Sequence, residues 1–178
     1  MSNLKKHIVF LTPGFPLNTE DTTTIPALQI YLKSLQEVIT NTKLSIIIFQ
    51  YPFTNINYMW NGIAVFPLNG KNNRLKKYWI WHKAKQTLEQ LHKKHPITTV
   101  HSFWIGECSK IGEHFSLKHN IKHLVTVMGQ DAIKKNRYTK QLQNTNTKII
   151  TLSTNHKKAL LKNTGLHSEI IPWFIDQD

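Results

Sequence analysis

The chain has 178 residues, of which 40% are apolar and 19% are charged, as expected for one globular domain with a buried core. No run approaches the ~20 consecutive apolar residues that a bilayer requires, and the single cysteine, Cys108, excludes an internal disulfide. The short apolar run near the N-terminus does not resemble a signal peptide, which together with the lone cysteine favours a cytoplasmic location.

The chain is strongly basic. Lys and Arg number 23 against 10 Asp and Glu, so the net charge is +13 and anionic partners are favoured: nucleic acid, anionic lipid or phosphorylated ligands. Only Arg74 and Arg137 are arginines, and base recognition favours Arg, so nucleic acid is the least favoured of these partners. The alternative is that the lysines merely solvate the chain.

The chain opens with a strand, a loop and a helix. The apolar run at residues 7–12 predicts a strand, and a helix is expected from Thr24, a good N-cap, with Pro26 in its first turn. This is the start of a βαβ unit, whose ligands usually lie beyond the carboxyl ends of the strands. Gly14 lies in the connecting loop, where its backbone N–H could approach a phosphate with no Cβ in the way; a plain turn glycine is the alternative.

Strands and helices continue to alternate along the chain. Further apolar runs predict strands at residues 44–49, 63–68, 97–101, 123–128, 148–152 and 169–171. Helices are expected at residues 75–94, 108–119 and 154–162, with a short helical piece at 132–142 and a long connection at 51–61. This alternation predicts an α/β fold with a doubly wound parallel sheet, in which residues 1–178 form a single domain.

The helix at residues 75–94 begins with a mixture of cations and aromatic side chains. Lys76, Lys77, Trp79 and Lys83 are the residues that would contact a membrane or another anionic partner, with Trp at the interface and Lys on the headgroups. The alternative is that the aromatic side chains pack on the sheet while the lysines face water.

Polar residues gather in three loops that follow strands, at residues 13–24, 101–107 and 129–131. The carboxyl ends of parallel strands share one edge of a sheet, so these loops could converge on a single cleft. The chain has no G-x-G-x-x-G, no P-loop and no H-E-x-x-H, and we expect neither a dinucleotide cofactor nor a metal.

Four segments, in order, resemble motifs of the N-terminal half of family 4 glycosyltransferases, which are retaining enzymes of the GT-B type. Residues 7–14 resemble the first strand and its glycine loop, and residues 100–104 (VHSFW) resemble the family's "VHxHW" segment. Residues 126–131 (TVMGQD) resemble "TxHGxD", and residues 151–153 with 170–176 resemble "hhxxS … hIPNGhD". The resemblance covers essentially the whole chain and implies a Rossmann-like domain.

The resemblance also implies roles for particular residues. It places the Gly14 N–H near the diphosphate of the donor, and it places His101, Trp104 and Glu107 on the acceptor side.

Two positions depart from the family pattern. Phe103 stands at the second histidine of "VHxHW", and Met128 stands where the family has a histidine that contacts the reacting sugar. Gln130 or Asp131 could take over part of that role and are the candidate catalytic residues. Asp131 could instead be the N-cap of a following helix.

The implied reaction moves a sugar from a nucleotide-sugar donor to a lipid or polysaccharide acceptor with retention, mainly by positioning and by stabilising the departing diphosphate. In the family a second domain holds most of the nucleotide-sugar site, and nothing in residues 1–178 resembles it. We therefore expect an acceptor-side domain that is inactive alone, needs no cofactor or metal, and binds an anionic lipid or glycan at the inner face of the membrane. The alternative is a stand-alone, non-catalytic module that binds a phosphorylated ligand, or nucleic acid nonspecifically, through its basic surface.

Overall fold

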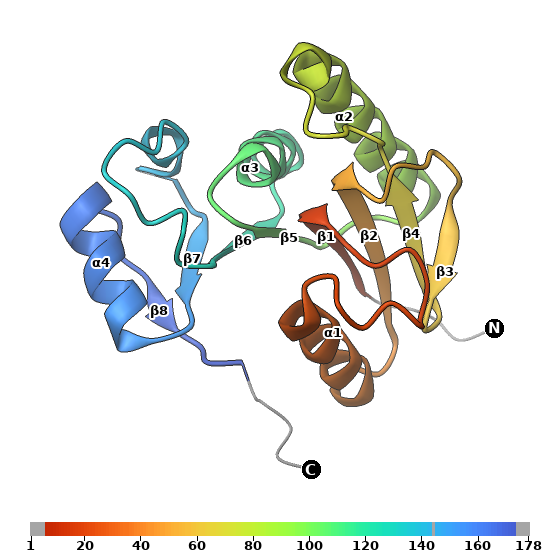
Figure 1. Ribbon diagram of the computed structural model, residues 1–178, viewed down its shortest axis with the longest axis horizontal. Helices are drawn as coiled ribbons and strands as arrows, with labels where there is room; N and C mark the ends of the chain where they lie inside the picture. Colours follow the sequence, from red (N-terminus) through yellow and green to blue (C-terminus); the bar gives the residue numbers. More distant parts are fainter. Residues whose placement is uncertain (1–5, 144, 174–178) are drawn as a thin grey trace.

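A computed structural model describes residues 6–143 and 145–173, which form one sheet of eight strands with helices on both faces (Figure 1). The strand order is β3-β4-β2-β1-β5-β6-β7-β8, and every neighbouring pair is parallel except β3 and β4. The predicted α/β class and doubly wound, mostly parallel sheet are confirmed.

The elements follow the alternation that the apolar runs predict. The strands are β1 (Lys6–Gly14), β2 (Thr42–Tyr51), β3 (Tyr58–Trp60), β4 (Ile63–Pro67), β5 (Thr99–Phe103), β6 (Lys122–Val127), β7 (Lys148–Thr151) and β8 (Glu169–Ile170). The helices are α1 (Pro26–Val38), α2 (Lys77–Lys94), α3 (Glu107–His119) and α4 (Thr154–Thr164), with 3₁₀ turns η1 (Arg74–Lys76) and η2 (Thr139–Leu142).

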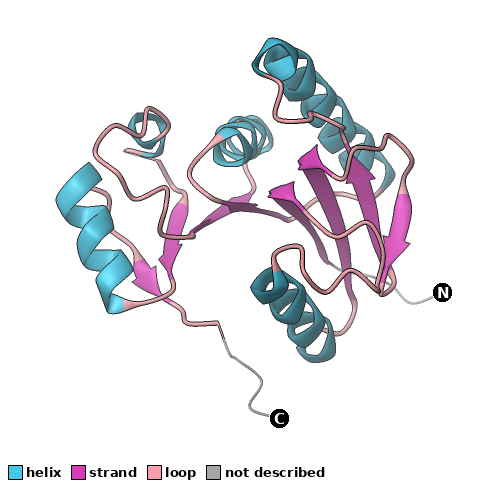
Figure 2. Cartoon of the chain, viewed as in Figure 1, coloured by secondary structure: helices cyan, strands magenta, loops and turns pink. Residues whose placement is uncertain are grey.

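The two faces of the sheet are covered differently. In Figure 2, α1 lies on one side of the central strands, while α2 and α3 lie on the other. Successive side chains of a strand point to opposite faces, so Val9 and Leu11 of β1 pack with α2 and α3, while Phe10 packs with α1. A third cluster joins α4 to β6 and β7. No helix in the described part of the chain combines the length and apolar character that crossing a bilayer requires.

The sheet has its topological switch point between β1 and β5. The chain runs from β1 to β2 and β4 on one side, then returns across the sheet to β5 on the other side of β1. Ligands of open α/β sheets bind at the carboxyl ends of the strands at such a point. The order β1-β5-β6 also makes neighbours of the strands that precede the three polar loops.

The start of the first helix differs from the prediction. Its N-cap is Ile25, in the left-handed region at φ 50° and without a side-chain cap, so the prediction of a Thr24 N-cap is wrong. The Thr24 hydroxyl instead donates to the Asp21 carboxylate at 2.7 Å, and that carboxylate also accepts the Thr24 N–H at 3.0 Å. A side chain committed to the preceding turn cannot cap the helix.

Three other segments also depart from the predictions. The connection at residues 51–61 contains β3, an edge strand antiparallel to β4. The strand expected at residues 97–101 lies two residues later, which places His101 in the middle of β5. The helix expected at residues 132–142 is absent except for η2. The Asn136 amide instead donates to the carbonyls of Ile105 and Asp131, which fixes the segment against the neighbouring loops.

Candidate functional site

The carboxyl end of β1 carries Gly14, which is buried and paired with Tyr51 of β2. A Cβ at this position would lie 3.6 Å from Ile25 Cδ1 and 3.8 Å from the Tyr51 carbonyl oxygen, which are ordinary contacts, and φ is not in the left-handed region. Neither the backbone conformation nor crowding therefore requires glycine at position 14. This geometry removes the usual reasons for a turn glycine, which are a left-handed backbone and crowding at Cβ.

Asp131 joins the loops that follow β5 and β6. One carboxylate oxygen accepts the N–H of Ile105 at 2.6 Å, and the other accepts the N–H of Met128 at 3.0 Å. Burial raises the pKa of this carboxyl, and the backbone N–H groups oppose that shift. The segment that follows begins with turns and carries a regular element only at η2, so Asp131 caps two loops and not the N-terminus of a helix.

His101 lies inside the sheet and not at its edge. Its side chain is almost fully buried, with Nε2 2.8 Å from Thr126 Oγ1 and its ring 4.6 Å from the ring of Phe103. Burial lowers the pKa of His101 to about 3, so the imidazole is neutral near pH 7. Any influence on a ligand passes through the residues packed around it.

Trp104 and Gln130 are the members of this group that lie nearer the surface. Trp104 follows β5 at φ 66°, donates its N–H to the Thr126 carbonyl at 2.9 Å and is half-buried. The Gln130 side chain is exposed in the loop after β6. The structure thus places Gly14, Trp104 and Gln130 at the ends of three adjacent strands.

The loop after β6 also meets the start of α4, a contact that the sequence analysis missed. Gly129 has φ +101°, and a Cβ there would lie 3.0 Å from Nε2 of His156. His156 is held in the first turn of α4, where its N–H donates to Ser153 Oγ at 3.2 Å. The glycine of the "TxHGxD"-like segment could have indicated a close contact at residue 129. Nothing in the sequence around His156 indicates that this histidine makes the contact.

Glu107 points to a different part of the same edge. It is the first residue of α3, and its carboxylate lies 3.5 Å from Lys77 Nζ of α2. Lys77 also donates to the Tyr138 hydroxyl at 2.7 Å. Glu107 therefore lines an open groove, with Lys77 and Tyr138, between α2, α3 and the loop after β6.

The start of α2 exposes aromatic side chains. Ile80, Ala84, Leu88 and Leu91 cover the sheet, whereas Tyr78 is 76% exposed and Trp79 is 47% exposed. The alternative that the aromatic side chains of this helix pack on the sheet is therefore wrong for Tyr78 and Trp79, whereas it holds for Trp81, which is partly buried against the core. Lys83 Nζ lies 3.9 Å above the Trp79 ring, Lys76 is exposed, and Lys77 turns into the groove. The four predicted contact residues thus divide between an exposed helix surface and the groove.

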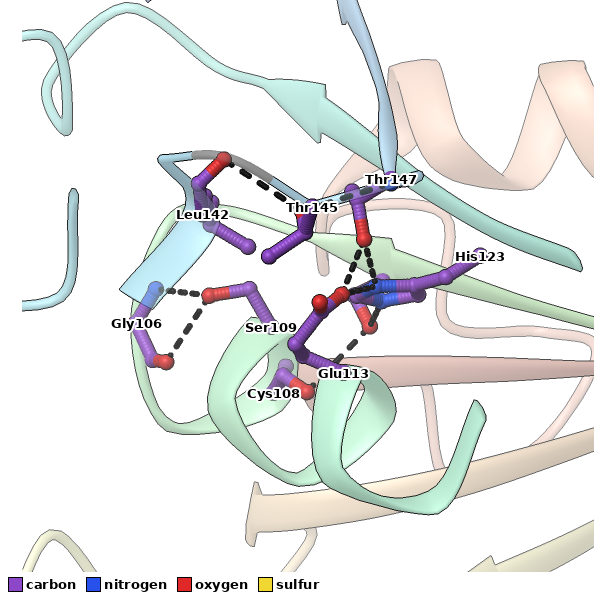
Figure 3. Close-up of polar contacts among 9 residues, drawn as sticks. Gly106, Cys108, Ser109, Glu113, His123, Leu142, Thr145 and Thr147 are labelled. Carbon is purple, nitrogen blue, oxygen red and sulfur yellow. Dashed lines mark hydrogen bonds and ion pairs between the residues drawn. The ribbon is translucent and has the colours of Figure 1, made fainter. Parts of the chain in front are cut away.

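A buried polar network resembles a catalytic triad in its distances. His123 lies 2.9 Å from Ser102 Oγ through Nε2 and 2.8 Å from Glu113 through Nδ1, and Thr147 donates to the same carboxylate (Figure 3). Ser102 is fully buried, and a Cβ on Gly112 would come within 2.5 Å of its Oγ. No substrate could reach this serine, so the network joins α3 to β5, to β6 and to the residue before β7 as a structural element.

The strand order, the switch point and the row of loops define an α/β domain of the Rossmann-like kind found in GT-B proteins. No family model matches the chain, and no curated protein sequence matches it. Solved structures do. One sucrose-phosphate synthase structure from Thermosynechococcus elongatus is 11% identical over 96% of this chain and 91% of that chain, with a TM-score of 0.66.

Two longer chains show the same likeness. Another structure of the Thermosynechococcus elongatus sucrose-phosphate synthase is 12% identical with a TM-score of 0.59, and a UDP-N-acetylglucosamine 2-epimerase is 14% identical with a TM-score of 0.55. Each match covers 94% of this chain and 48% of the other, so the chain spans about half the length of these proteins. At these identities the likeness establishes the fold, which is the fold that the motif resemblance implied.

Proposed function

We propose that the chain is the acceptor-side domain of a family 4 glycosyltransferase, which moves a sugar from a nucleotide-sugar to a lipid or polysaccharide acceptor with retention. One observation carries the proposal. Segments that resemble the family's motifs include the carboxyl ends of β1, β5, β6 and β7, which lie along one edge of a sheet whose fold also occurs in a sucrose-phosphate synthase. The last motif continues at residues 170–176, of which residues 174–176 lie outside the described part of the chain. A chance resemblance in sequence would have no reason to collect at strand ends beside the switch point.

In this proposal the residues at this edge have different roles. Gly14 offers a position where the donor diphosphate can approach the backbone, and the exposed Gln130 is the side chain best placed to contact the sugar. Asp131 is a positioning residue, because both of its oxygens hold backbone N–H groups of the two loops. His101 positions Thr126 and Phe103 from beneath, and Trp104 borders the acceptor.

The reaction in this proposal needs no metal or organic cofactor from these residues. The donor nucleotide is held mainly by a second domain, and the chain alone does not transfer sugar. Catalysis consists of orienting the acceptor hydroxyl and stabilising the departing diphosphate.

We further propose that the protein works at the cytoplasmic face of a membrane. Lys76, Trp79 and Lys83 lie toward the start of α2, where indole and ammonium groups can contact the headgroup region. Their contact with anionic lipid would bring a membrane-embedded acceptor to the strand ends. Polysaccharide or glycolipid synthesis is the setting that fits such an acceptor.

The test begins with the protein in its source cells. An antibody raised against residues 1–178 should detect a band near twice the 20.8 kDa of this chain. The immunopurified protein should transfer label from UDP-glucose, UDP-N-acetylglucosamine or GDP-mannose to a lipid extract of the same cells. The 178-residue chain alone is the matched inactive control.

A band at 20.8 kDa without transfer would contradict the proposal and favour the second candidate, a stand-alone module that binds a phosphorylated ligand. The groove beside α2 is the observation that favours this candidate. Steeply salt-dependent binding to DNA in the same preparation would instead indicate a nonspecific nucleic-acid binder.

A further inference from the structure

The groove between α2, α3 and the loop after β6 has a volume of about 840 Å³, and most of the charged side chains that line it are positive. Both arginines of the chain, Arg74 and Arg137, line it, together with Lys77 and Lys135. Glu107 is the one carboxylate among the described residues that line the groove. Four cations therefore face a single compensating anion, an arrangement that attracts a ligand with more than one negative charge.

The contacts inside the groove leave most of these cations available. Lys77 is engaged, since its Nζ donates to Tyr138 and lies 3.5 Å from Glu107. Within the described ranges, Arg74, Lys135 and Arg137 form no ion pair. Arginine binds phosphate through paired N–H groups, so two arginines on one groove are well suited to a phosphate group.

Tyr138 also favours an acceptor in the ligand. Its hydroxyl oxygen accepts from Lys77 Nζ at 2.7 Å and from Arg137 Nη2 at 3.3 Å. A tyrosine hydroxyl has two acceptor lone pairs and one proton. Because both lone pairs are used by cations, the proton can be donated to a ligand oxygen.

Neutral and acidic groups of the groove suit hydroxyls. The Oε2 atom of Glu107 is buried and has no hydrogen-bond partner among the described residues, so it can accept from a hydroxyl. The Gln50 side chain is oriented by its Oε1, which accepts the N–H of Asn72 at 2.8 Å, and its amide group remains a donor. A carboxylate that accepts and an amide that donates, beside a cluster of cations, are the groups expected to bind the hydroxyls of a phosphorylated polyol.

We propose that this groove is a binding site for a phosphorylated polyol, with the phosphate on Arg74 and Arg137 and the hydroxyls on Glu107 and Gln50. The groove would bind such a ligand whether or not the chain transfers sugar. Two sources carry this chemistry: a free sugar phosphate, and the headgroup of an inositol phospholipid. The border of the groove is compatible with the phospholipid source, because it exposes apolar side chains that could contact a membrane. Tyr78 and Ile133 line the groove with exposed side chains, and Leu75, which is 93% exposed, is next to Arg74 in the chain.

Calorimetry on the 178-residue chain tests the soluble source. Glucose 6-phosphate should bind and uncharged glucose should not, and Arg74→Gln and Arg137→Gln should each weaken binding about tenfold or more, as expected for a lost charge-assisted hydrogen bond. Lys94→Gln, which removes an exposed charge at the far end of α2, is the matched control and should leave binding unchanged. Unfolding temperatures of all three variants establish that the fold is intact.

Glu107→Gln separates phosphate recognition from hydroxyl recognition. Removing the one carboxylate should strengthen binding of inorganic phosphate, while the preference for glucose 6-phosphate over inorganic phosphate should fall. The same variants are then mixed with phosphatidylcholine vesicles that contain phosphatidylinositol. If the lipid headgroup is the source, sedimentation with these vesicles should be lost in Arg74→Gln and weakened in Leu75→Ser, whereas Leu75→Ser should not affect the soluble phosphate.

The proposal is overturned if neither glucose 6-phosphate nor the phosphatidylinositol vesicles bind. It is equally overturned if binding survives both arginine substitutions to the extent that it survives Lys94→Gln, or if glucose binds as well as its phosphate.

Discussion

The strand-end row and the groove beside α2 lie on the same edge of the sheet but use their polar residues differently. In the row, His101 and Asp131 are buried, and His101 Nε2 and both carboxylate oxygens of Asp131 are hydrogen-bonded to other parts of the protein. In the groove, Arg74, Lys135 and Arg137 are exposed and, within the described residues, form no ion pair. Residues that belong to a motif-like segment can therefore hold the loops of a site in place without contacting a ligand. Residues outside any motif can be the ones whose side chains are free to bind it.

The largest expected effect is acid destabilisation by two buried histidines, His101 in the strand-end row and His7 at the other end of β1. Burial lowers the pKa of His7 to about 4 and that of His101 to about 3, against 6.5 for an exposed histidine. The unfolded chain thus binds more protons below pH 6.5, and stability falls as the pH decreases from 6.5 toward these values. Each histidine contributes a slope of about 1.4 kcal/mol per pH unit.

Urea denaturation between pH 7.5 and 5 measures this slope. A free energy of unfolding that stays flat from pH 6.5 to 5 would contradict the assignment of both histidines as neutral core residues.

Asp131→Ala should cost about 2–4 kcal/mol of unfolding free energy, because it leaves the buried N–H of Ile105 and the partly buried N–H of Met128 without their acceptors. Gln130→Ala, one residue away and exposed, is the matched control and should change stability by less than about 0.5 kcal/mol. Equal losses in both variants would remove the distinction between a residue that holds the loops and a residue that faces the ligand.

Two glycine substitutions compare a crowded position with one where a Cβ would make ordinary van der Waals contacts. Gly112→Ala should cost about 1–3 kcal/mol, because its Cβ would meet Ser102 Oγ and His123 Nε2 at 2.5 Å. Gly14→Ala meets nothing closer than 3.6 Å and should change stability by less than about 1 kcal/mol, yet under the proposed function it should reduce sugar transfer by the native protein.

Thermal unfolding and the transfer assay give the two readouts. Full activity in Gly14→Ala would show that no ligand approaches the backbone at that position.

The smallest expected change in stability belongs to the groove. Arg74→Gln and Arg137→Gln remove exposed side chains without an ion pair among the described residues, and each should alter the free energy of unfolding by less than about 0.5 kcal/mol. A loss above 1 kcal/mol in chemical denaturation would mean that these arginines support the fold, and the contrast between the two regions would disappear.

Some of the site could be predicted and some could not. The loops that carry Trp104 and Gln130 were recognisable, because each follows an apolar run that ends abruptly and because their segments resemble family motifs. Gly14 was expected in such a loop, but β1 extends through it. His101 was expected to border the acceptor, yet a strand boundary two residues later places it in the core. A shift of this size lies within the usual uncertainty of strand ends in a sequence, but it decides whether a side chain meets solvent or the core.

Local order was determined by the sequence itself. Apolar runs of strand length alternating with helical spacing determined the α/β class, most of the strands and helices, and the loops that follow each strand, because these features depend on near neighbours in the chain.

Proximity between distant segments was decided only by the tertiary structure. The return of the chain from β4 across the sheet to β5 made neighbours of β1, β5 and β6, and the placement of α2 beside the loop after β6 brought Arg74 and Arg137 to one groove. No local pattern encodes such a meeting, because it depends on strand order and on which face each crossover takes.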